Sequence, residues 1–329
     1  MAAGLETNMK IYQEQFAGQV NELLAQQGNI FNAASNGAIR LSTKSRRADY
    51  VYNSFFSAVG STLAARRDLT SLGAQTDTNL AQDEHITVKL SRKIIPIGMA
   101  RDAFRKAFGH YSQEEFTSIV AEQAANAMQI EMCDTALLAV SRALKNESAS
   151  YYTETSMGSI SSQTLVNILK KMGDRADRVV CWVMHSKAYY DLVLNQISAN
   201  ITPLSNFNIA TGTPVTLNRP VIITDSASLK TQLNSPDVDN YFTMGLVEGA
   251  VEVENSEEQE VVVQDVTGLE NLVIRFQGEY AYNLGVKGFR YDVSSGGANP
   301  TGTNVGTGSN WDKHFTDVKD RAGVVAATL

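Results

Sequence analysis

Residues 113–146 contain neither glycine nor proline, and this run constrains the fold more than any other part of the chain. It is rich in Ala, Glu, Gln, Met and Leu, which are good helix formers. Ser112 and Glu115 have the S-x-x-E spacing of a capping box, which satisfies exposed amides at a helix start. We therefore predict one helix from Gln113 to Asn146, roughly 50 Å long at 1.5 Å per residue.

A helix of that length favours an elongated, plate-like protein over a compact enzyme, because the average helix has about three turns. Seven apolar side chains at suitable spacing are predicted to pack it: Phe116, Ile119, Val120, Met128, Leu137, Val140 and Leu144.

The residues before this helix predict a shorter helix and then a long excursion. Apolar residues recur at helical spacing over Leu5–Gln27, whereas the following GNIFNAASNGAIRL is predicted to be irregular. Residues 48–59 have a strand-like composition, and HITVKLSRKII, from His85, alternates apolar and polar residues as a half-buried strand does. We expect a basic two-stranded segment from about Gly37 to Ile97 that projects and packs on a neighbour, because an isolated ribbon is only marginally stable.

The part of the chain after the long helix is predicted to be mixed α/β. Apolar spacing around Leu165–Met172 indicates a helix, and VVCWVM (179–184) is an apolar run typical of a buried strand. HSKAYYDLVLNQI then predicts a helix, and PVIITD (220–225) a further buried strand. Residues 241–293 are β-like, and the Gly-, Ser-, Thr- and Asn-rich residues 294–309 are predicted to be extended or flexible.

Composition excludes several classes of protein. Hydrophobic residues make up 43% of the chain, which is enough for a core. No apolar run reaches the eighteen or so residues of a membrane helix, and the start has no secretory pattern. Two distant cysteines do not make a disulfide framework, and a net charge of −7 argues against a dedicated nucleic-acid binder.

The charge is distributed unevenly along the chain. Residues 40–106 contain twelve basic and six acidic residues, whereas residues 237–270 contain ten acidic and no basic residues. Copies of such a chain can attract each other, although two ordinary solvated surfaces or, for the arginines, contact with DNA are the alternatives. The candidate inter-subunit contacts are Arg46, Arg47, Arg66, Arg67, Glu254, Glu257, Glu258 and Glu260.

No catalytic, metal or cofactor motif is present. None of the four histidines has metal-ligand spacing to another His or Cys, and the chain lacks G-x-S-x-G, P-loop and G-x-G-x-x-G patterns. His185 beside Ser186 is compatible with a nucleophilic site, but Ser186 is better explained as the cap of the following helix. Cys133 and Cys181 are expected in the core, and the glutamates around 252–260 are expected to be solvated rather than metal-bound. We predict no catalytic, cofactor or metal residue and no enzyme.

The order of these parts resembles the Hong Kong 97-type major capsid protein of tailed bacteriophages. VVCWVMHSKAYYDL (179–192) is similar to the strand–helix element of that family's axial domain, and RPVIITDSA (219–227) to its later strand. YFTMGLVEGAVEVE (241–254) resembles the return into the peripheral domain, and GANPTGTNVGTGSNWDK (297–313) resembles the tail of one capsid subgroup. The resemblance covers nearly the whole chain.

The resemblance implies an α+β capsid fold in which each segment has a defined place. The implied parts are an N-terminal arm at 1–36, an extended β-hairpin loop at 37–97, a peripheral domain with the spine helix at 98–149, an α/β axial domain at 150–240, a peripheral β region at 241–293 and a C-terminal tail at 294–329.

The resemblance also implies the function and partners of a phage head protein. Hexamers and pentamers would form an icosahedral shell in the virion around packaged double-stranded DNA, contacted without sequence specificity, after synthesis in the host cytoplasm. Because the arm-like helix begins almost at Met1, we expect a separate scaffolding protein, together with a portal and decoration proteins, and no membrane. The alternatives are an encapsulin-like compartment shell, another structural virion protein such as a tail tube subunit, or a hydrolase using Ser186 and His185.

Overall fold

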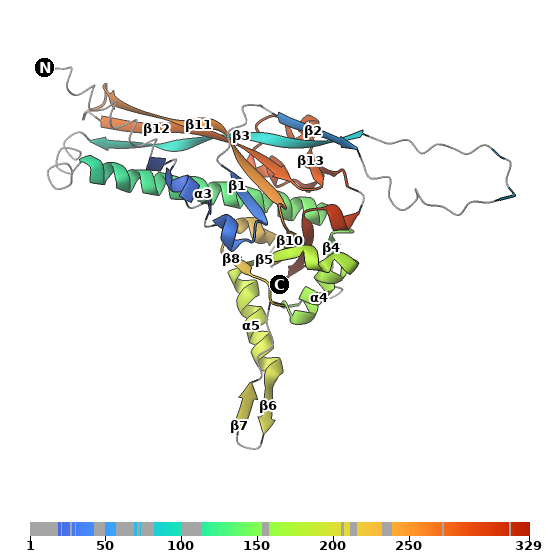
Figure 1. Cartoon of the computed structure of the whole chain (residues 1–329). Helices are drawn as coiled ribbons and strands as arrows, with labels where there is room; N and C mark the ends of the chain where they lie inside the picture. The colour runs from blue at the N-terminus through green and yellow to red at the C-terminus, as the bar shows by residue number, and fades with distance from the viewer. Residues whose placement is uncertain are drawn as a thin grey trace.

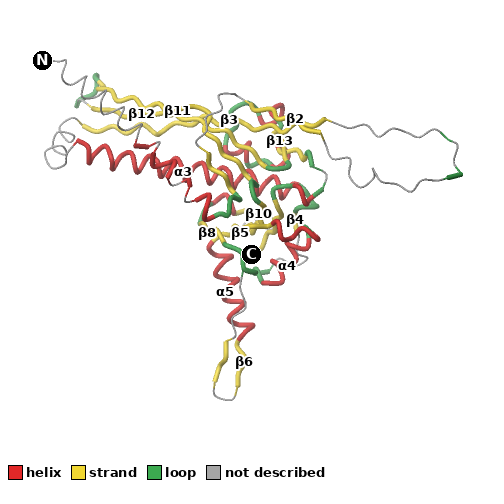
Figure 2. The backbone as a smooth tube through the Cα atoms, viewed as in Figure 1, coloured by secondary structure: helices red, strands yellow, loops and turns green. Residues whose placement is uncertain are grey.

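Helix α3 runs from Gln113 to Asn146 without a break, as the sequence predicts (Figure 1). The computed structural model describes residues 19–20, 22–26, 28–29, 31–42, 50–56, 69–70, 73, 82–100, 113–152, 158–204, 207–210, 216–231, 239–271, 273–315 and 317–329. The predicted capping residue Ser112 therefore lies outside the described residues. In Figure 2 the strands of one sheet run alongside this helix, and a second group of strands lies below its far end.

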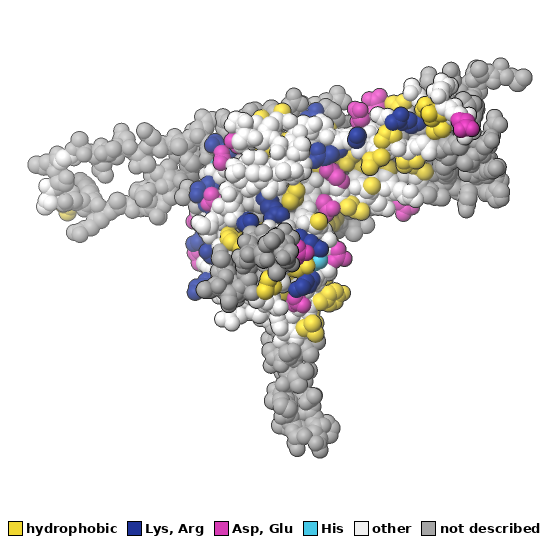
Figure 3. Space-filling model, turned by 180° about the vertical axis from the view of Figure 1, so that it is seen from behind, with side chains coloured by type: hydrophobic (Ala, Val, Ile, Leu, Met, Phe, Trp, Pro, Cys, Tyr) yellow, Lys and Arg dark blue, Asp and Glu magenta, His cyan; other side chains and the backbone are white. Residues whose placement is uncertain are grey.

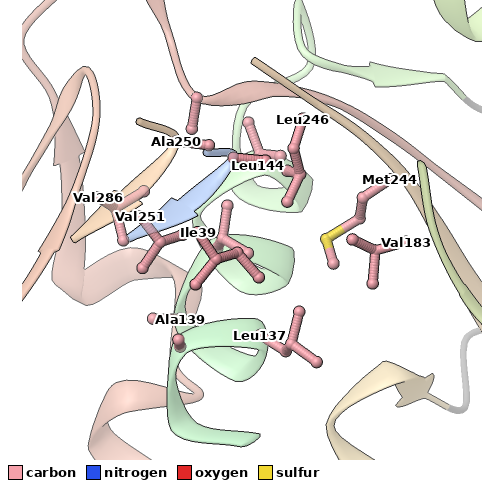
Figure 4. Packing of buried hydrophobic residues seen from close by; sticks show 14 of the residues in the cluster. Ile39, Leu137, Ala139, Leu144, Val183, Met244, Leu246, Ala250, Val251 and Val286 are labelled. Carbon is pink, nitrogen blue, oxygen red and sulfur yellow. The ribbon is translucent and has the colours of Figure 1, made fainter. Parts of the chain in front are cut away.

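Helix α3 packs by the face that the sequence predicts. Met128, Leu137, Val140 and Leu144 are buried and Val120 is half-buried, while the side chains of Phe116 and Ile119 lie outside the described residues. Figure 4 shows the buried side chains that pack around this helix. Ile39, Val251 and Val286 surround the helix on one side, and Val183, Met244 and Leu246 on the other, so α3 lies between two sheets.

The first sheet has five strands in the order β1-β11-β12-β3-β2. Its strands are β1 (Ile39–Ser42), β2 (Tyr50–Phe56), β3 (Gln82–Ala100), β11 (Val251–Val266) and β12 (Val273–Val286). All pairs are antiparallel except β1 with β11, which is parallel. The long strands β3, β11 and β12 lie along α3 and form with it the elongated upper part of the molecule in Figure 1.

The second sheet forms the body of the molecule, below α3 and the long strands in Figure 1. Its strand order is β4-β15-β10-β5-β8, with β9 paired to β10. These strands are β4 (Tyr151–Tyr152), β5 (Val179–His185), β8 (Val221–Thr224), β9 (Lys230–Thr231), β10 (Asn240–Val247) and β15 (Gly323–Thr328). Helix α4 (Ser162–Lys170) packs on β4 and β15, and α5 (Ser186–Asn200) packs on β5 and β8. The predicted helices and the buried strand β5 are thereby confirmed, whereas β8, which the sequence predicts to be buried, is half-buried and Ile223 on it is exposed.

Short elements complete the described chain. Beyond α5, the hairpin β6–β7 projects from the body (Figure 1). The short strands are β6 (Ile201–Leu204), β7 (Phe207–Ala210), β13 (Phe289–Tyr291) and β14 (Trp311–Lys313), the short helices α6 (Val293–Gly296) and α7 (Gly302–Val305), and the 3-10 turns η2 (Gly173–Arg178), η3 (Ala227–Leu229), η4 (Gly308–Asn310) and η5 (Val318–Asp320).

The prediction for residues 28–41 is wrong. Residues 28–29 and 31–34 are helical, and β1 begins at Ile39. Asparagine here stabilises local turns, because the Asn32 side chain donates to the Leu41 carbonyl and accepts from the Leu41 amide. Most of the predicted helix Leu5–Gln27 lies outside the described residues, and the described positions within it are helical.

The predicted excursion 37–97 is too wide at both ends. Strands β2 and β3 do pair antiparallel, from Tyr50 opposite Val88 to Phe56 opposite Gln82. However, β1 pairs with β11, and β3 from Val88 onward pairs with β12, so both ends of the range are part of the first sheet. The reason is packing, since Ile39, Val88 and Leu90 are fully buried.

The prediction of an extended or flexible segment at 294–309, within the tail 294–329, is also wrong. Residues 302–305 are helical, capped by the Thr301 hydroxyl, and Val305 and Trp311 are buried. The Asn304 side chain donates to the Gly296 carbonyl, and that of Asn310 to the Asn304 carbonyl. Polar and glycine residues therefore form tight turns here, while two apolar anchors hold the segment in the core.

A half-buried carboxylate on α3 bonds to the first sheet. Glu131 on α3 accepts from Arg92 Nε at 2.7 Å, Tyr280 Oη at 3.2 Å, Tyr282 Oη at 2.9 Å and Thr135 Oγ1 at 3.1 Å. Burial, followed by the charge of Glu131, raises the pKa of both tyrosines, so their hydroxyls remain hydrogen-bond donors. Burial lowers the pKa of Arg92, but the hydrogen bond to Glu131 and the nearby Tyr282 raise it, and the net change is upward.

Replacement of Ala127 by proline should prevent the chain from accumulating as soluble folded protein. Ala127 is an exposed position near the middle of α3, and an interior proline costs about 3 kcal/mol or more by removing a backbone hydrogen bond. Far-UV circular dichroism and size-exclusion chromatography would measure the effect. Ala127→Ser, which keeps the hydrogen bond, is the control and should cost only a few tenths of a kcal/mol. A soluble Ala127→Pro variant with an unchanged melting temperature would contradict the role of α3.

Glu131→Ala should lower the free energy of unfolding by about 2–3 kcal/mol, because Arg92 and two tyrosine hydroxyls lose a charged acceptor. Urea unfolding monitored by tyrosine fluorescence would measure it. Glu122→Ala, an exposed position on the same helix, is the control and should change stability by less than about 0.5 kcal/mol. Equal losses in the two variants would show that the carboxylate of Glu131 does not hold the helix to the sheet.

Candidate functional site

His185, Ser186 and Asp225 lie at the carboxyl ends of the parallel strands β5 and β8. His185 and Ser186 are the pair that the sequence leaves open as a nucleophilic site, but the order of their hydrogen bonds does not fit one. The Ser186 hydroxyl donates to Asp225 Oδ1, and His185 Nδ1 accepts from the Lys187 amide at 3.2 Å. A serine nucleophile needs the imidazole as its base, with the carboxylate behind the imidazole. The arrangement therefore does not activate Ser186.

These bonds also correct the prediction that Ser186 caps the helix. Ser186 is the first residue of α5, and its hydroxyl is directed to Asp225. The amide of Lys187, in the first turn, is instead satisfied by the ring of His185. The His185 imidazole therefore caps the helix, in the role that a serine, threonine, aspartate or asparagine side chain has in most helices.

His185 itself is a buried structural residue. Its side chain is 6% exposed, and its ring centroid lies 4.6 Å from that of Tyr241. Because Nδ1 accepts, the neutral ring carries its proton on Nε2, which is buried and has no hydrogen-bond partner among the described residues. Burial, then the charge of Lys230, lowers the pKa of His185; Lys187 acts in the same direction, while Asp225 and Asp239 oppose it.

The prediction that both cysteines lie in the core is confirmed for Cys181 but not for Cys133. Cys181 is fully buried in β5, and Cys133 is half-buried on α3. Burial raises the pKa of the Cys133 thiol to about 12 and that of Cys181 to about 11. Both are thus protonated at neutral pH, and a protonated thiol is neither a good nucleophile nor a metal ligand.

The described residues contain no group of three or more His, Cys, Asp or Glu side chains that could hold a metal ion. Among the predicted acidic contact residues, Glu254 is half-buried and Glu260 is exposed, both on β11, whereas the side chains of Glu257 and Glu258 lie outside the described residues. The predicted basic contact residues all lie outside the described part of the chain: Arg46, Arg47, Arg66 and Arg67. None of the described helices combines the length and the apolar character needed to cross a membrane.

The start of the basic segment does meet the acidic segment within one chain. Arg40 on β1 lies opposite Glu252 in the register of β1 and β11, and its Nη2 is 2.7 Å from Glu248 Oε1. Both side chains are exposed, so this pair contributes little stability, about 0–1 kcal/mol. Part of the charge asymmetry seen in the sequence is therefore balanced inside the subunit.

A cavity of about 560 Å³ lies at the junction of the two sheets, lined by Arg40, Arg178, Glu248 and Lys287 among others. Arg40 and Arg178 at this cavity are each paired with a carboxylate, that of Glu248 and that of Asp320. Lys287 Nζ donates to the Glu248 carbonyl at 3.0 Å, and Arg178 Nη1 lies 3.0 Å from Asp320 Oδ1. Burial, then the neighbouring Arg178 and Arg40, lowers the pKa of Lys287. We interpret these contacts as structural, because they connect β1 to the turn between β10 and β11.

Comparisons with known proteins give a consistent picture. A family model described as Gp13-like, major capsid protein 13-like, matches residues 8–325. No significant match to a curated protein is found.

Several solved structures share the fold. One is titled "Capsid of Ralstonia phage GP4", with a TM-score of 0.52, 10% identity and coverage of 89% of this chain and 87% of that chain. A structure from Mycobacterium phage Adephagia gives a TM-score of 0.51 at 9% identity and covers 90% of this chain and 89% of that chain. A structure from Mycobacterium phage Cain gives a TM-score of 0.50 at 11% identity, with coverage of 90% of this chain and 89% of that chain.

His185 should make the folded chain less stable as the pH falls below about 6.5, the ordinary histidine pKa. Its folded-state pKa is lowered, so the unfolded chain binds the proton more tightly, and stability is lost from the unfolded pKa down to the folded pKa. The slope for one proton is at most about 1.4 kcal/mol per pH unit. His185→Phe, which keeps an aromatic ring, should lose less stability than the unmodified chain between pH 6.5 and pH 5. Parallel curves from urea unfolding across this range would contradict the assignment.

Proposed function

The chain belongs to the Gp13-like family of major capsid proteins, and we propose that it builds the shell of a tailed-phage head from rings of six and five copies around packaged double-stranded DNA. It is a major capsid protein of a phage head, located in the virion capsid, and the expected Hong Kong 97-type fold is confirmed by the similarity to solved phage capsids. The observation that carries the proposal is the family match over residues 8–325, together with a matching fold over about 90% of the chain.

A structural role without catalysis is supported by the side-chain chemistry described above. The serine and histidine at the β5–α5 junction are not arranged as nucleophile and base, and the thiols are held protonated by burial. We infer that the chain acts by self-association, uses no cofactor and is not an enzyme.

We propose that the chain is divided as the family resemblance implies, with an arm at 1–36, an extended loop within 37–97, a peripheral domain around α3, an axial domain from 150 and a later peripheral β region. Strand pairing supports two changes to the predicted boundaries. Strands β10 and β15 pair in the same sheet as β5, so we assign residues 240–247 and 323–328 to the axial domain. The tail 294–329 is accordingly divided between the two domains.

The remaining partners are proposed from the family resemblance. They are a separate scaffolding protein, a portal, decoration proteins and the packaged DNA, which would be contacted without sequence specificity on the inner face. Synthesis in the host bacterial cytoplasm belongs to the same proposal. The loop within 37–97 would lie on a neighbouring subunit, since a two-stranded ribbon needs a surface to lie on.

Electron microscopy of particles purified from cells that express the chain tests the proposed function. We expect closed shells built from rings of six and five copies, and nuclease-protected DNA in particles isolated from a phage lysate. Cylinders would indicate a tail protein, and a shell that encloses a protein cargo would indicate a compartment shell. Folded protein that forms no assembly under any condition would refute the proposal.

The charge asymmetry yields a specific prediction about the contacts between subunits. Arg66→Glu combined with Arg67→Glu should block assembly, because the loop would become acidic there and would be repelled by the acidic surface of its neighbour. Each exposed pair contributes only about 0–1 kcal/mol, but a shell repeats the contact many times. Adding Glu257→Lys and Glu258→Lys should partly restore assembly, measured by sedimentation.

The DNA alternative makes the opposite prediction for the same variants. If the arginine variant assembles normally but packages less DNA, the arginines contact the packaged DNA and the inter-subunit interpretation is wrong. Thermal unfolding of the unassembled variants controls for a general loss of stability.

A further inference from the structure

A cavity of about 690 Å³ lies where residues 302–308 pack against the end of α3. It is lined by residues from α3, from β9 and from the segment that contains α7 and η4. The wall formed by that segment contains Gly302, Gly306 and Gly308. A Cβ atom at Gly308 would lie 2.9 Å from the Arg142 carbonyl oxygen, so glycine allows the segment to approach the helix closely.

The α3 side of this cavity carries two basic side chains. Arg142 and Lys145 lie one turn apart on the helix, and both line the cavity. The remaining side chains that line it are uncharged: Leu138, Asn146, Thr231, Thr303 and Thr307. Burial lowers the pKa of both basic side chains, and Arg142 lowers that of Lys145 further. No carboxylate in the described part of the chain raises either pKa, so the described residues leave this positive charge unbalanced.

The acidic residues nearest in the chain do not supply the missing charge. Glu147 is bonded to Lys313 at 2.9 Å and to Arg321 at 3.4 Å. Asp134, earlier on α3, and Asp239, beyond β9, do not affect the pKa of either basic side chain. Basic and acidic side chains lie close together over much of the surface in Figure 3. The cavity differs from that pattern, and half-buried cations are more stable with an anion beside them.

Arg142 is held in position by neutral groups rather than by a carboxylate. Its Nη2 donates to the Lys230 carbonyl at 2.9 Å, and its guanidinium carbon lies 5.0 Å from the centre of the Phe242 ring. That hydrogen bond uses one of the five N–H groups of a guanidinium. The cavity therefore presents an oriented cation beside the threonine hydroxyls that line it.

We propose that this cavity binds a phosphate group, which Arg142 and Lys145 contact together. A phosphate carries up to two negative charges and several acceptor oxygens, so it accepts from a guanidinium, an ammonium and hydroxyl groups at once. A carboxylate has one charge and two oxygens, and it would satisfy fewer of these donors. The phosphate is either a free ion or part of a nucleic acid. The inference does not depend on assembly, so the unassembled chain serves for its test.

Isothermal titration calorimetry of the purified full-length chain tests the site. The probes are sodium phosphate and sodium pyrophosphate, with sodium chloride at equal ionic strength as the reference. We expect saturable binding at one site. Lys145→Gln should weaken it by about tenfold, because a hydrogen bond between charged groups is lost, and Lys145→Arg should retain it. Lys170→Gln is the matched control, since Lys170 is also the basic residue in the last turn of its helix, and it should leave binding unchanged.

Two calorimetric outcomes would overturn the inference. One is the absence of saturable binding to the unmodified chain, and the other is equal weakening by Lys145→Gln and Lys170→Gln. Asp237 belongs to residues 232–238, which lie outside the described residues, and Asp237→Asn examines it. This variant should bind phosphate as the unmodified chain does. Binding that is about tenfold tighter would show that a carboxylate of the same chain already occupies the cavity, and the inference would be wrong.

Chemical footprinting provides a second measurement and separates the two sources of phosphate. An amine with a lowered pKa reacts readily with acetic anhydride near neutral pH, and mass spectrometry measures the acetylation of Lys145. Protection of Lys145 by inorganic phosphate but not by a short DNA duplex identifies a free ion. Protection by the duplex at a lower concentration of phosphate groups identifies a nucleic acid. Protection by neither, or equal protection by sodium chloride, would overturn the inference.

Discussion

Helix α3 has to pack against two different sheets at once, and the rest of the structure depends on how it does so. Its apolar side chains pack between the two sheets, but apolar contacts are not directional and would allow the helix to slide or rotate against them. Two carboxylates, one on the helix and one just past its end, fix the position of the helix. Glu131 is held by donors from β3 and β12, and Glu147, just past the helix end, by Lys313 and the buried Arg321. Both carboxylates are half-buried and Arg321 is fully buried, and a charge removed from water is costly without its partner, so these bonds favour one register of the helix.

The buried Arg321 extends this constraint to the late part of the chain. Its Nε donates to the Phe315 carbonyl at 2.9 Å and its Nη1 to Ser150 Oγ at 3.1 Å, in addition to Glu147. The guanidinium therefore links Glu147 at the end of α3, Ser150 before β4, and Phe315, which precedes β15 in the chain. Apolar packing around Trp311 and Tyr291 then fills the space beside this joint, with the two rings 5.1 Å apart. Hydrophobic burial supplies most of the stability, while the charged groups select the arrangement.

Much of the fold could be predicted from local sequence, and the failures have a common cause. The bounds of α3 followed from a run without helix breakers, and β5, α5 and β8 from apolar runs and helical spacing. Residues 28–41 and 294–309 were misjudged, because Asn32, Asn304 and Asn310 bond to backbone groups that are close only in the folded chain. Distant partners such as Arg92 for Glu131 leave no local pattern either.

The position of β15 has a consequence for the time at which the subunit matures. Strand β4 pairs with β15, and β15 joins it to β10, although β15 follows β4 by about 170 residues. At 5–20 residues per second on the ribosome, β4 waits roughly 10 to 30 seconds for the strand beside it. The nascent chain therefore cannot complete this sheet, or the helix seated on it, until almost all the residues described here have been made. Any association that needs this sheet complete must therefore follow the synthesis of β15.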